Sequence, residues 1–145
     1  MGKRHRARES AVQCLYQWEV TGADPEGLLA GYWENHGPPE LAIKRFAETL
    51  FHGVVAHAEE IDAMISAQTE HWHIDRLGLV EKAILRLGVY ELLFESDTPP
   101  AVVIDEALEI CKRFSGPEAG PFVNGVLDGI KERAVAGATG KVDER

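Results

Sequence analysis

Apolar residues recur at intervals of three and four positions along almost the whole chain. This spacing is typical of one face of an α-helix, and no segment alternates strictly between apolar and polar residues as a half-buried strand does. Short breaks containing proline or glycine, at 37–39, 97–100 and 115–117, separate the periodic stretches. The pattern predicts an all-α protein of about seven helices, packed as two small three-helix-like bundles.

The segment 79–94 is apolar on nearly every side, which predicts a central helix covered by its neighbours. A buried strand is the alternative, but the length of the segment and its charged residues, Glu81, Lys82 and Arg86, favour a helix. Small and polar residues fill 136–145, where we expect a frayed tail. At 145 residues the chain has the length of a single domain, 1–145.

Charge is distributed very unevenly along the chain. The net charge is −9, from 15 Lys and Arg against 24 Asp and Glu, which by itself argues against binding to nucleic acid. Yet the basic N-terminal segment 1–8 contains four Lys or Arg residues and no acid, which leaves −13 on residues 9–145. Cations are mildly unfavourable at the start of a helix, so a polyanionic partner would explain them. A solubilising tail explains the charge equally well at this point.

The sequence contains no pattern that indicates catalysis. A Walker motif and a dinucleotide-binding glycine motif are both missing, and the six histidines are scattered. Cys14 and Cys111 lie in apolar helical patterns, which predicts buried free thiols rather than a disulfide or a zinc site. We therefore expect no enzyme, metal or cofactor. The chain also has no apolar run long enough for a membrane helix and no signal peptide, so we expect a cytoplasmic protein.

Three motifs follow one another along the chain. They are RARESAVQCLY at 6–16, VEKAILRLGVYEL at 80–92, and AVVIDEA at 101–107 with FVNGVL at 122–127. In sequence and spacing these motifs resemble the NusB family of bacterial transcription antitermination factors, over roughly residues 4–131.

The resemblance implies an all-helical NusB-like fold and a role in transcription. Proteins of this family bind the boxA element of leader RNA from ribosomal RNA operons, in partnership with NusE, which is also a small-subunit ribosomal protein. The complex joins the elongating RNA polymerase with other Nus factors, without a cofactor or catalysis. Some members instead form a homodimer through the surface that would otherwise meet RNA, so the resemblance leaves the oligomeric state open.

The resemblance also assigns RNA contacts to particular residues. The basic segment of the family, its RNA-facing tyrosine, the turn before its central helix and the loop before its last helix fall on Lys3, Arg4, His5, Arg6, Arg8, Tyr16, Asp75, Leu79, Lys82, Glu118 and Phe122. Glu81 falls where the RNA and NusE surfaces adjoin, which leaves its partner open.

Several of these residues have simpler alternative roles. Tyr16 would serve equally as a contact at the rim of the core, and Phe122 as a core residue. Leu79 stands where some members have a polar residue, and Glu118 would repel phosphate although it could accept a hydrogen bond from a base amino group. For the whole chain, the alternative is a helical protein-interaction module with no RNA role of its own. The acidic residues 9–145 would be complementary to a basic partner protein, whether or not the chain binds RNA.

Overall fold

The computed structural model describes residues 2–37, 39–69, 77–95 and 97–143, with side chains described as far as residue 134. Within these ranges the chain forms seven helices and no strand, which confirms the predicted all-α class. The helices are α1 (Lys3–Thr21), α2 (Pro25–His36), α3 (Leu41–Ala56), α4 (Ala58–Gln68), α5 (Leu79–Leu93), α6 (Pro100–Phe114) and α7 (Ala119–Asp143).

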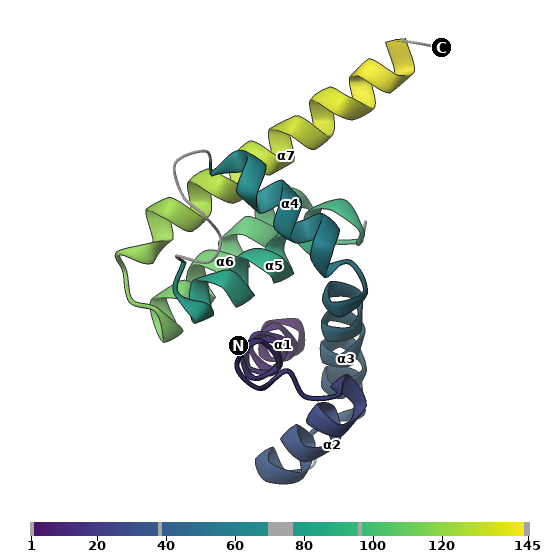
Figure 1. Ribbon diagram of the computed structural model, residues 1–145, viewed down its shortest axis with the longest axis vertical. Coiled ribbons are helices and arrows are strands. Elements are labelled where there is room, and N and C mark those ends of the chain that lie inside the picture. The colour runs from purple at the N-terminus through teal and green to yellow at the C-terminus, as the bar shows by residue number, and fades with distance from the viewer. Residues whose placement is uncertain (1, 38, 70–76, 96, 144–145) are drawn as a thin grey trace.

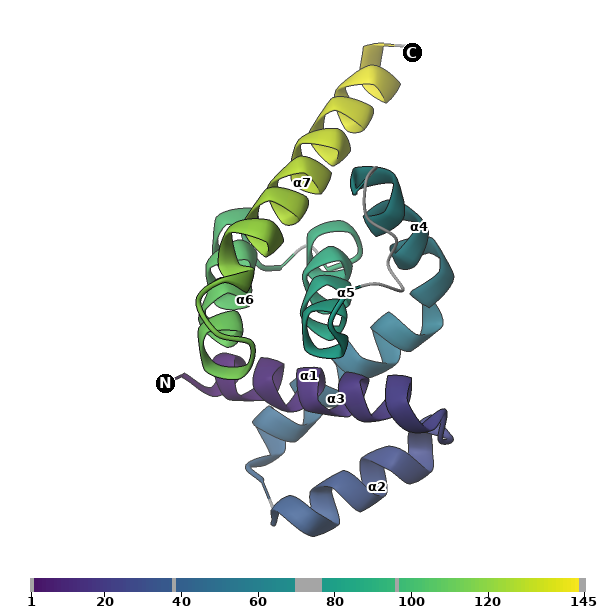
Figure 2. The ribbon, with the colours of Figure 1, turned by 60° about the vertical axis from the view of Figure 1, so that its left-hand side comes forward.

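The helices form an N-terminal group, α1 to α3, and a C-terminal group, α4 to α7 (Figure 1). Helix α1 packs on α2 and α3 of its own group and also on α5, so it joins the two groups. Helix α5 contacts α1, α3, α4, α6 and α7 and lies in the middle of the molecule (Figure 2). The apolar segment 79–94 is therefore the central helix that the sequence predicts.

Local sequence signals set several helix ends. The Asp24 side chain accepts a hydrogen bond from the Gly27 N–H at 3.2 Å, and Pro25 follows as the first residue of α2. Gly37 ends α2 with a φ of 79°, a conformation that glycine adopts without steric cost. His57 alone separates α3 from α4.

The core runs through both groups of helices. Its fully buried side chains include Leu15 of α1, Phe51 of α3, Ile84 and Leu85 of α5, and Leu127 of α7. Such burial contributes about 2 kcal/mol for each large apolar side chain.

The two cysteines, Cys14 and Cys111, are buried and free, as the sequence predicts. Burial raises the pKa of the Cys14 thiol to about 12 and that of the Cys111 thiol to about 11. Both thiols are therefore protonated at neutral pH and act as small apolar side chains.

The last helix extends further than the sequence suggests. Helix α7 runs to Asp143 and projects beyond the other helices, through most of the segment 136–145 (Figure 1). Its alanines favour a continuous helix despite the glycines. Fraying of this end stays a prediction. Among the described residues, no helix combines the length and the apolar character that crossing a membrane requires.

Candidate nucleic-acid interface

The first turns of α1 divide the basic N-terminal segment into exposed and buried residues. Lys3, Arg4 and Arg6 are exposed to solvent. The Lys3 ammonium pairs with Glu40 at 2.9 Å, and the Arg4 guanidinium lies over the Phe46 ring, 4.4 Å from its centroid. Both side chains of the Lys3–Glu40 pair are more than half exposed, so this pair is weak and readily exchanged for another anion.

Arg8 lies on the inner side of α1, with an exposed fraction of 3%. Its Nε and Nη2 donate to the two carboxylate oxygens of Glu91 at 2.7 and 2.9 Å, and Nη2 also donates to Thr98 Oγ1 at 3.4 Å. Glu91 is itself 1% exposed. This two-pronged pair is a buried structural link between α1 and α5. A direct contact between Arg8 and RNA would require the pair to open, so that contact stays a prediction.

His5 is also turned inward, between two carboxylates. Its Nε2 lies 3.3 Å from Glu9, and its Nδ1 is hydrogen-bonded to Glu106 of α6. Positions 5 and 8 lie one turn apart on the same side of α1, which is the side that faces α5 and α6. Lys3, Arg4 and Arg6 are therefore accessible to an external anion. His5 and Arg8 instead contact carboxylates within the protein.

Tyr16 lies further along α1, at the edge of a surface hollow that we call the Tyr16 hollow. The hollow has a volume of about 300 Å³, and Tyr16 itself is 40% exposed. Its walls come from four helices: Val12, Gln13, Tyr16 and Gln17 of α1, His36 of α2, Val80 of α5 and Phe114 of α6. At 1.5 Å per residue, Tyr16 lies about 20 Å along the helix axis from Lys3.

A second hollow, which we call the Phe122 hollow, adjoins the first. It has a volume of about 350 Å³ and is lined by Leu77, Gly78, Glu81, Ser115, Glu118, Ala119 and Phe122. The two hollows lie next to each other along α5 and α6, since Val80 and Phe114 line one and their chain neighbours Glu81 and Ser115 line the other. Leu79, at the start of α5, is 42% exposed and lines neither hollow, but its chain neighbours Gly78 and Val80 line the Phe122 hollow and the Tyr16 hollow.

The hollows bring together four residues that the resemblance assigns to binding, Tyr16, Glu81, Glu118 and Phe122, and Leu79 is exposed beside them. Glu81 accepts a hydrogen bond from Ser115 Oγ at 3.2 Å, which fixes its carboxylate at the rim. Phe122 is half-buried and packs against the core, which is the alternative to an RNA contact that the sequence left open. The same side chain also lines the Phe122 hollow. The fold thus places two aromatic rings and two carboxylates in the lining of two neighbouring hollows.

Lys82 is turned away from solvent toward α1. Its ammonium pairs with Glu19 at 2.5 Å, and its side chain is 11% exposed. Arg86 pairs with the same Glu19 carboxylate at 3.1 Å and donates two hydrogen bonds to Asp62 of α4, at 2.8 and 2.7 Å. The hydrogen bond from Lys82, supported by Arg86, holds the pKa of Glu19 below its ordinary value. This network links α1, α4 and α5, and an RNA contact by Lys82 stays a prediction.

Sequence reasoning missed one cation close to the hollows. Arg113, near the end of α6, is 63% exposed and donates to both carboxylate oxygens of Glu9 at 3.0 and 3.1 Å. It directly precedes Phe114, which lines the Tyr16 hollow. Its partner lies 104 residues away in sequence, so no local pattern could have indicated this position. Asp75 lies outside the described residues.

Within the described part of the chain, no three His, Cys, Asp or Glu side chains gather in a way that would hold a metal ion. The two hollows instead offer the exposed ring of Tyr16, the half-buried ring of Phe122 and the hydrogen-bond acceptors of Glu81 and Glu118. Aromatic rings stack on unpaired bases, and carboxylates accept hydrogen bonds from base amino groups. Basic side chains on α1 would contact the phosphate backbone.

Comparison with known proteins shows the family of the chain. The family model described as "NusB family" matches residues 5–132. The chain belongs to the NusB family. The transcription antitermination protein NusB of Treponema pallidum (strain Nichols) is 45% identical over 132 residues, covering 90% of this chain and 94% of the relative. The corresponding NusB of Methylacidiphilum infernorum is 40% identical, covering 90% and 91%.

Solved structures of NusB proteins share the fold as well. A crystal structure of the antitermination factors NusB and NusE in complex with double-stranded RNA matches with a TM-score of 0.85 at 36% identity. The match covers 92% of this chain and 98% of that one. NusB of T. maritima matches with a TM-score of 0.81 at 38% identity, covering 89% and 90%. The NusB-like architecture predicted from the sequence is thereby confirmed.

Proposed function

We propose that this chain is a transcription antitermination factor that binds boxA leader RNA of ribosomal RNA operons together with NusE. In this role it joins the elongating RNA polymerase in the cytoplasm, where bacterial transcription takes place. The observation that carries the proposal is the gathering of Tyr16, Glu81, Glu118 and Phe122 in the lining of the two adjoining hollows, with Leu79 exposed beside them. The role requires neither catalysis nor a cofactor.

Single-stranded RNA fits the hollows better than a duplex does. Bases in a duplex are stacked on one another, and the bases of a single strand are free to stack on exposed rings. Tyr16 offers an exposed ring at the edge of the Tyr16 hollow, and Phe122 offers a half-buried ring in the lining of the Phe122 hollow. Each base–aromatic contact contributes about 1–3 kcal/mol to binding.

The carboxylates around the hollows favour recognition of bases over nonspecific attraction to the phosphate backbone. Glu81 and Glu118 repel phosphates but accept hydrogen bonds from base amino groups. Phosphate contacts fall instead to Lys3, Arg4 and Arg6, toward the other end of α1. We therefore expect modest affinity for RNA alone and stronger binding once NusE supplies further contacts.

Fluorescence anisotropy with labelled RNA tests the proposal. A single-stranded boxA oligonucleotide should bind at least about tenfold more tightly than a scrambled one, a difference equal to one good base contact. Added NusE should increase the difference, and a boxA duplex should bind no better than the scrambled strand. Equal binding of the boxA and scrambled strands, with and without NusE, would contradict the proposal. That result would favour the helical protein-interaction module without an RNA role.

A further inference from the structure

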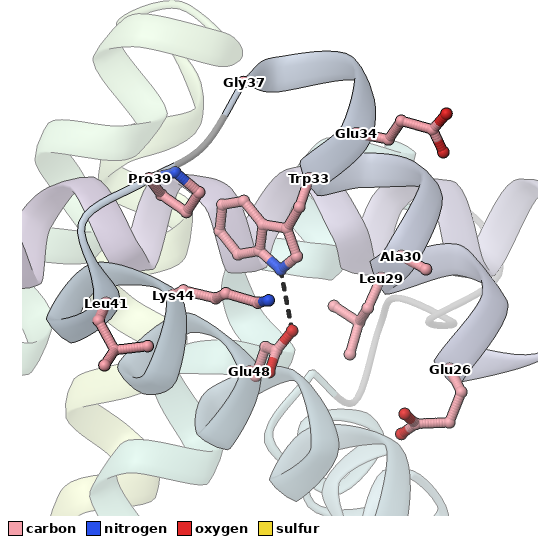
Figure 3. Close-up of a pocket in the computed structure, with 10 residues that line it drawn as sticks. All are labelled: Glu26, Leu29, Ala30, Trp33, Glu34, Gly37, Pro39, Leu41, Lys44 and Glu48. Atoms are coloured by element: carbon pink, nitrogen blue, oxygen red, sulfur yellow. Dashed lines mark hydrogen bonds between the residues drawn. The ribbon is translucent and has the colours of Figure 1, made fainter.

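Another depression lies in the N-terminal group of helices, separate from the Tyr16 hollow and the Phe122 hollow. This α2–α3 cleft has a volume of about 860 Å³ (Figure 3). Trp33 stands in its middle, between Pro39 on one side and Leu29 on the other. Leu41 forms part of the α3 side and is 59% exposed, the largest exposed fraction among the large apolar side chains that the structure describes.

The cleft exists because α2 and α3 both use their apolar faces against α1. Tyr32 of α2 is buried in the main core, and Ile43 and Ala47 of α3 pack on Ala7 of α1. Polar links connect the two helices instead. The Trp33 Nε1–H donates to Glu48 at 2.9 Å, and Glu26 pairs with His52 at 3.1 Å. The Trp33–Glu48 hydrogen bond spans the cleft and ties its two walls together (Figure 3).

The walls of the cleft are acidic as well as apolar. Glu26, Glu34 and Glu48 contribute three carboxylates, against the single ammonium group of Lys44. The Glu26–His52 pair is largely exposed, so it competes weakly with an incoming cation. The cleft thus combines an exposed apolar surface with negative charge, which is complementary to a basic amphipathic segment.

We propose that the α2–α3 cleft binds a lysine- or arginine-bearing amphipathic segment of a partner protein. The apolar side of the segment covers Leu41 and Trp33, and its cations pair with the glutamates along the rim. RNA is a poor occupant, because the three carboxylates repel phosphate. A small organic cation would leave Leu41 uncovered.

The cleft is independent of the proposed RNA surface. His36, the last residue of α2, lines the Tyr16 hollow, and the next residue, Gly37, lines the cleft. No residue lines both depressions. RNA and the partner segment can therefore be bound at the same time, and each contact can be tested without the other.

The first experiment locates the binding of a defined probe on the full ¹⁵N-labelled chain. The probe is a short amidated peptide of leucine and lysine with amphipathic helical spacing, and a leucine–glutamate peptide of the same length is its control. The lysine peptide should shift the Trp33 indole N–H and Leu41 amide signals, and the glutamate peptide should leave them unchanged. A Trp33→Phe variant assigns the indole signal. Shifts spread evenly over the acidic surface, or shifts of Trp33 on addition of boxA RNA, would overturn the proposal.

The second experiment separates the cleft from general acidity. The triple variant Glu26→Gln, Glu34→Gln and Glu48→Gln should weaken binding of the lysine peptide about tenfold, because three charge pairs are lost. Glutamine at 48 still accepts the hydrogen bond from Trp33. The control triple Glu59→Gln, Asp105→Asn and Glu132→Gln removes the same charge from exposed positions elsewhere and should change binding less than about twofold. Equal weakening by both triples would overturn the proposal.

A third comparison tests the apolar contact without any change in charge. Leu41→Ser should weaken peptide binding about fivefold, because the peptide no longer covers a leucine. Val20→Ser is the matched control, since Val20 is 54% exposed near the end of α1 and does not line the cleft. Both variants should bind boxA RNA as the wild type does. Unchanged peptide binding in Leu41→Ser would contradict the proposed mode.

Discussion

Arg6 and Arg8 stand two positions apart on α1, yet their surroundings are opposite. Arg6 is exposed, whereas Arg8 is buried and donates two hydrogen bonds to the buried Glu91. Removing one member of such a pair leaves a charge without its partner in the protein interior. The two arginines should therefore affect different properties of the protein.

We expect Arg8→Ala to lower the free energy of unfolding by about 3–5 kcal/mol, because Glu91 loses its partner. Urea denaturation monitored by circular dichroism measures the change. The double variant Arg8→Met and Glu91→Leu should recover most of the loss, since it removes both charges and fills the space. A loss below about 1 kcal/mol for Arg8→Ala would show that the pair is open in solution.

Arg6→Ala should leave the free energy of unfolding within about 0.5 kcal/mol, as is usual for an exposed position. Its effect should appear in RNA binding, where one phosphate contact is lost. Arg133→Ala removes an exposed arginine from α7 and serves as the matched control. Equal affinities of the two variants for boxA RNA would exclude Arg6 from the interface.

At the scale of elements, the Glu19 network ties α1 to α5, and Arg86 extends it to α4. The pKa of Glu19 is lowered in the folded protein, chiefly by the hydrogen bond from Lys82. The stability that this carboxylate contributes is therefore fully present above its unfolded pKa and is lost as the pH falls through its folded pKa.

Glu19→Gln tests the network through its pH dependence. The variant should be less stable than the wild type by about 2 kcal/mol at neutral pH, because hydrogen bonds to a charged group are lost. The difference should begin to shrink as the pH falls below the ordinary pKa of a glutamate, where the unfolded chain takes up the proton, and should vanish below the lowered pKa of Glu19 in the folded protein. Urea midpoints measured between neutral pH and about pH 3 give both curves. A difference that does not change with pH would contradict this account.

Tyr16 is part of the wall that α1 contributes to the Tyr16 hollow. Tyr16→Ala should weaken binding of boxA RNA by about 1–3 kcal/mol, because a stacking surface is lost. Tyr16→Phe keeps the ring and should bind nearly as the wild type does. Tyr16 is partly exposed, so neither change should unfold the protein. Equal losses in both variants would point to the hydroxyl group rather than to stacking.

The sequence predicted the helices well because their signals are local. Apolar spacing and the breaks containing proline or glycine depend only on neighbouring residues. The inward orientation of Arg8 and Lys82 could not be predicted. Their partners, Glu91 and Glu19, lie 83 and 63 residues away in the chain, and only the packing of α1 on α5 brings them close. Charge counted along the sequence thus overestimated the cations available to RNA.

At the scale of the whole molecule, charge is divided between a short basic stretch and an acidic body. Of the four Lys and Arg residues in 1–8, Lys3, Arg4 and Arg6 are exposed and Arg8 is not. The plot of log affinity against log salt for single-stranded RNA should therefore have a slope of about −2, at roughly −0.7 per neutralised phosphate. A slope of about −3 or steeper would mean that Arg8 leaves Glu91 when RNA binds.

Whether boxA RNA occupies the two adjoining hollows is the central question for the whole molecule. Mapping of ¹H–¹⁵N signal shifts on addition of single-stranded boxA RNA answers it most directly. We predict shifts at Tyr16, Leu79, Glu81, Glu118 and Phe122 and at the exposed cations of α1, with the Trp33 signal in the α2–α3 cleft unchanged. Shifts confined to the basic N-terminal segment, with the signals around both hollows unchanged, would contradict the account.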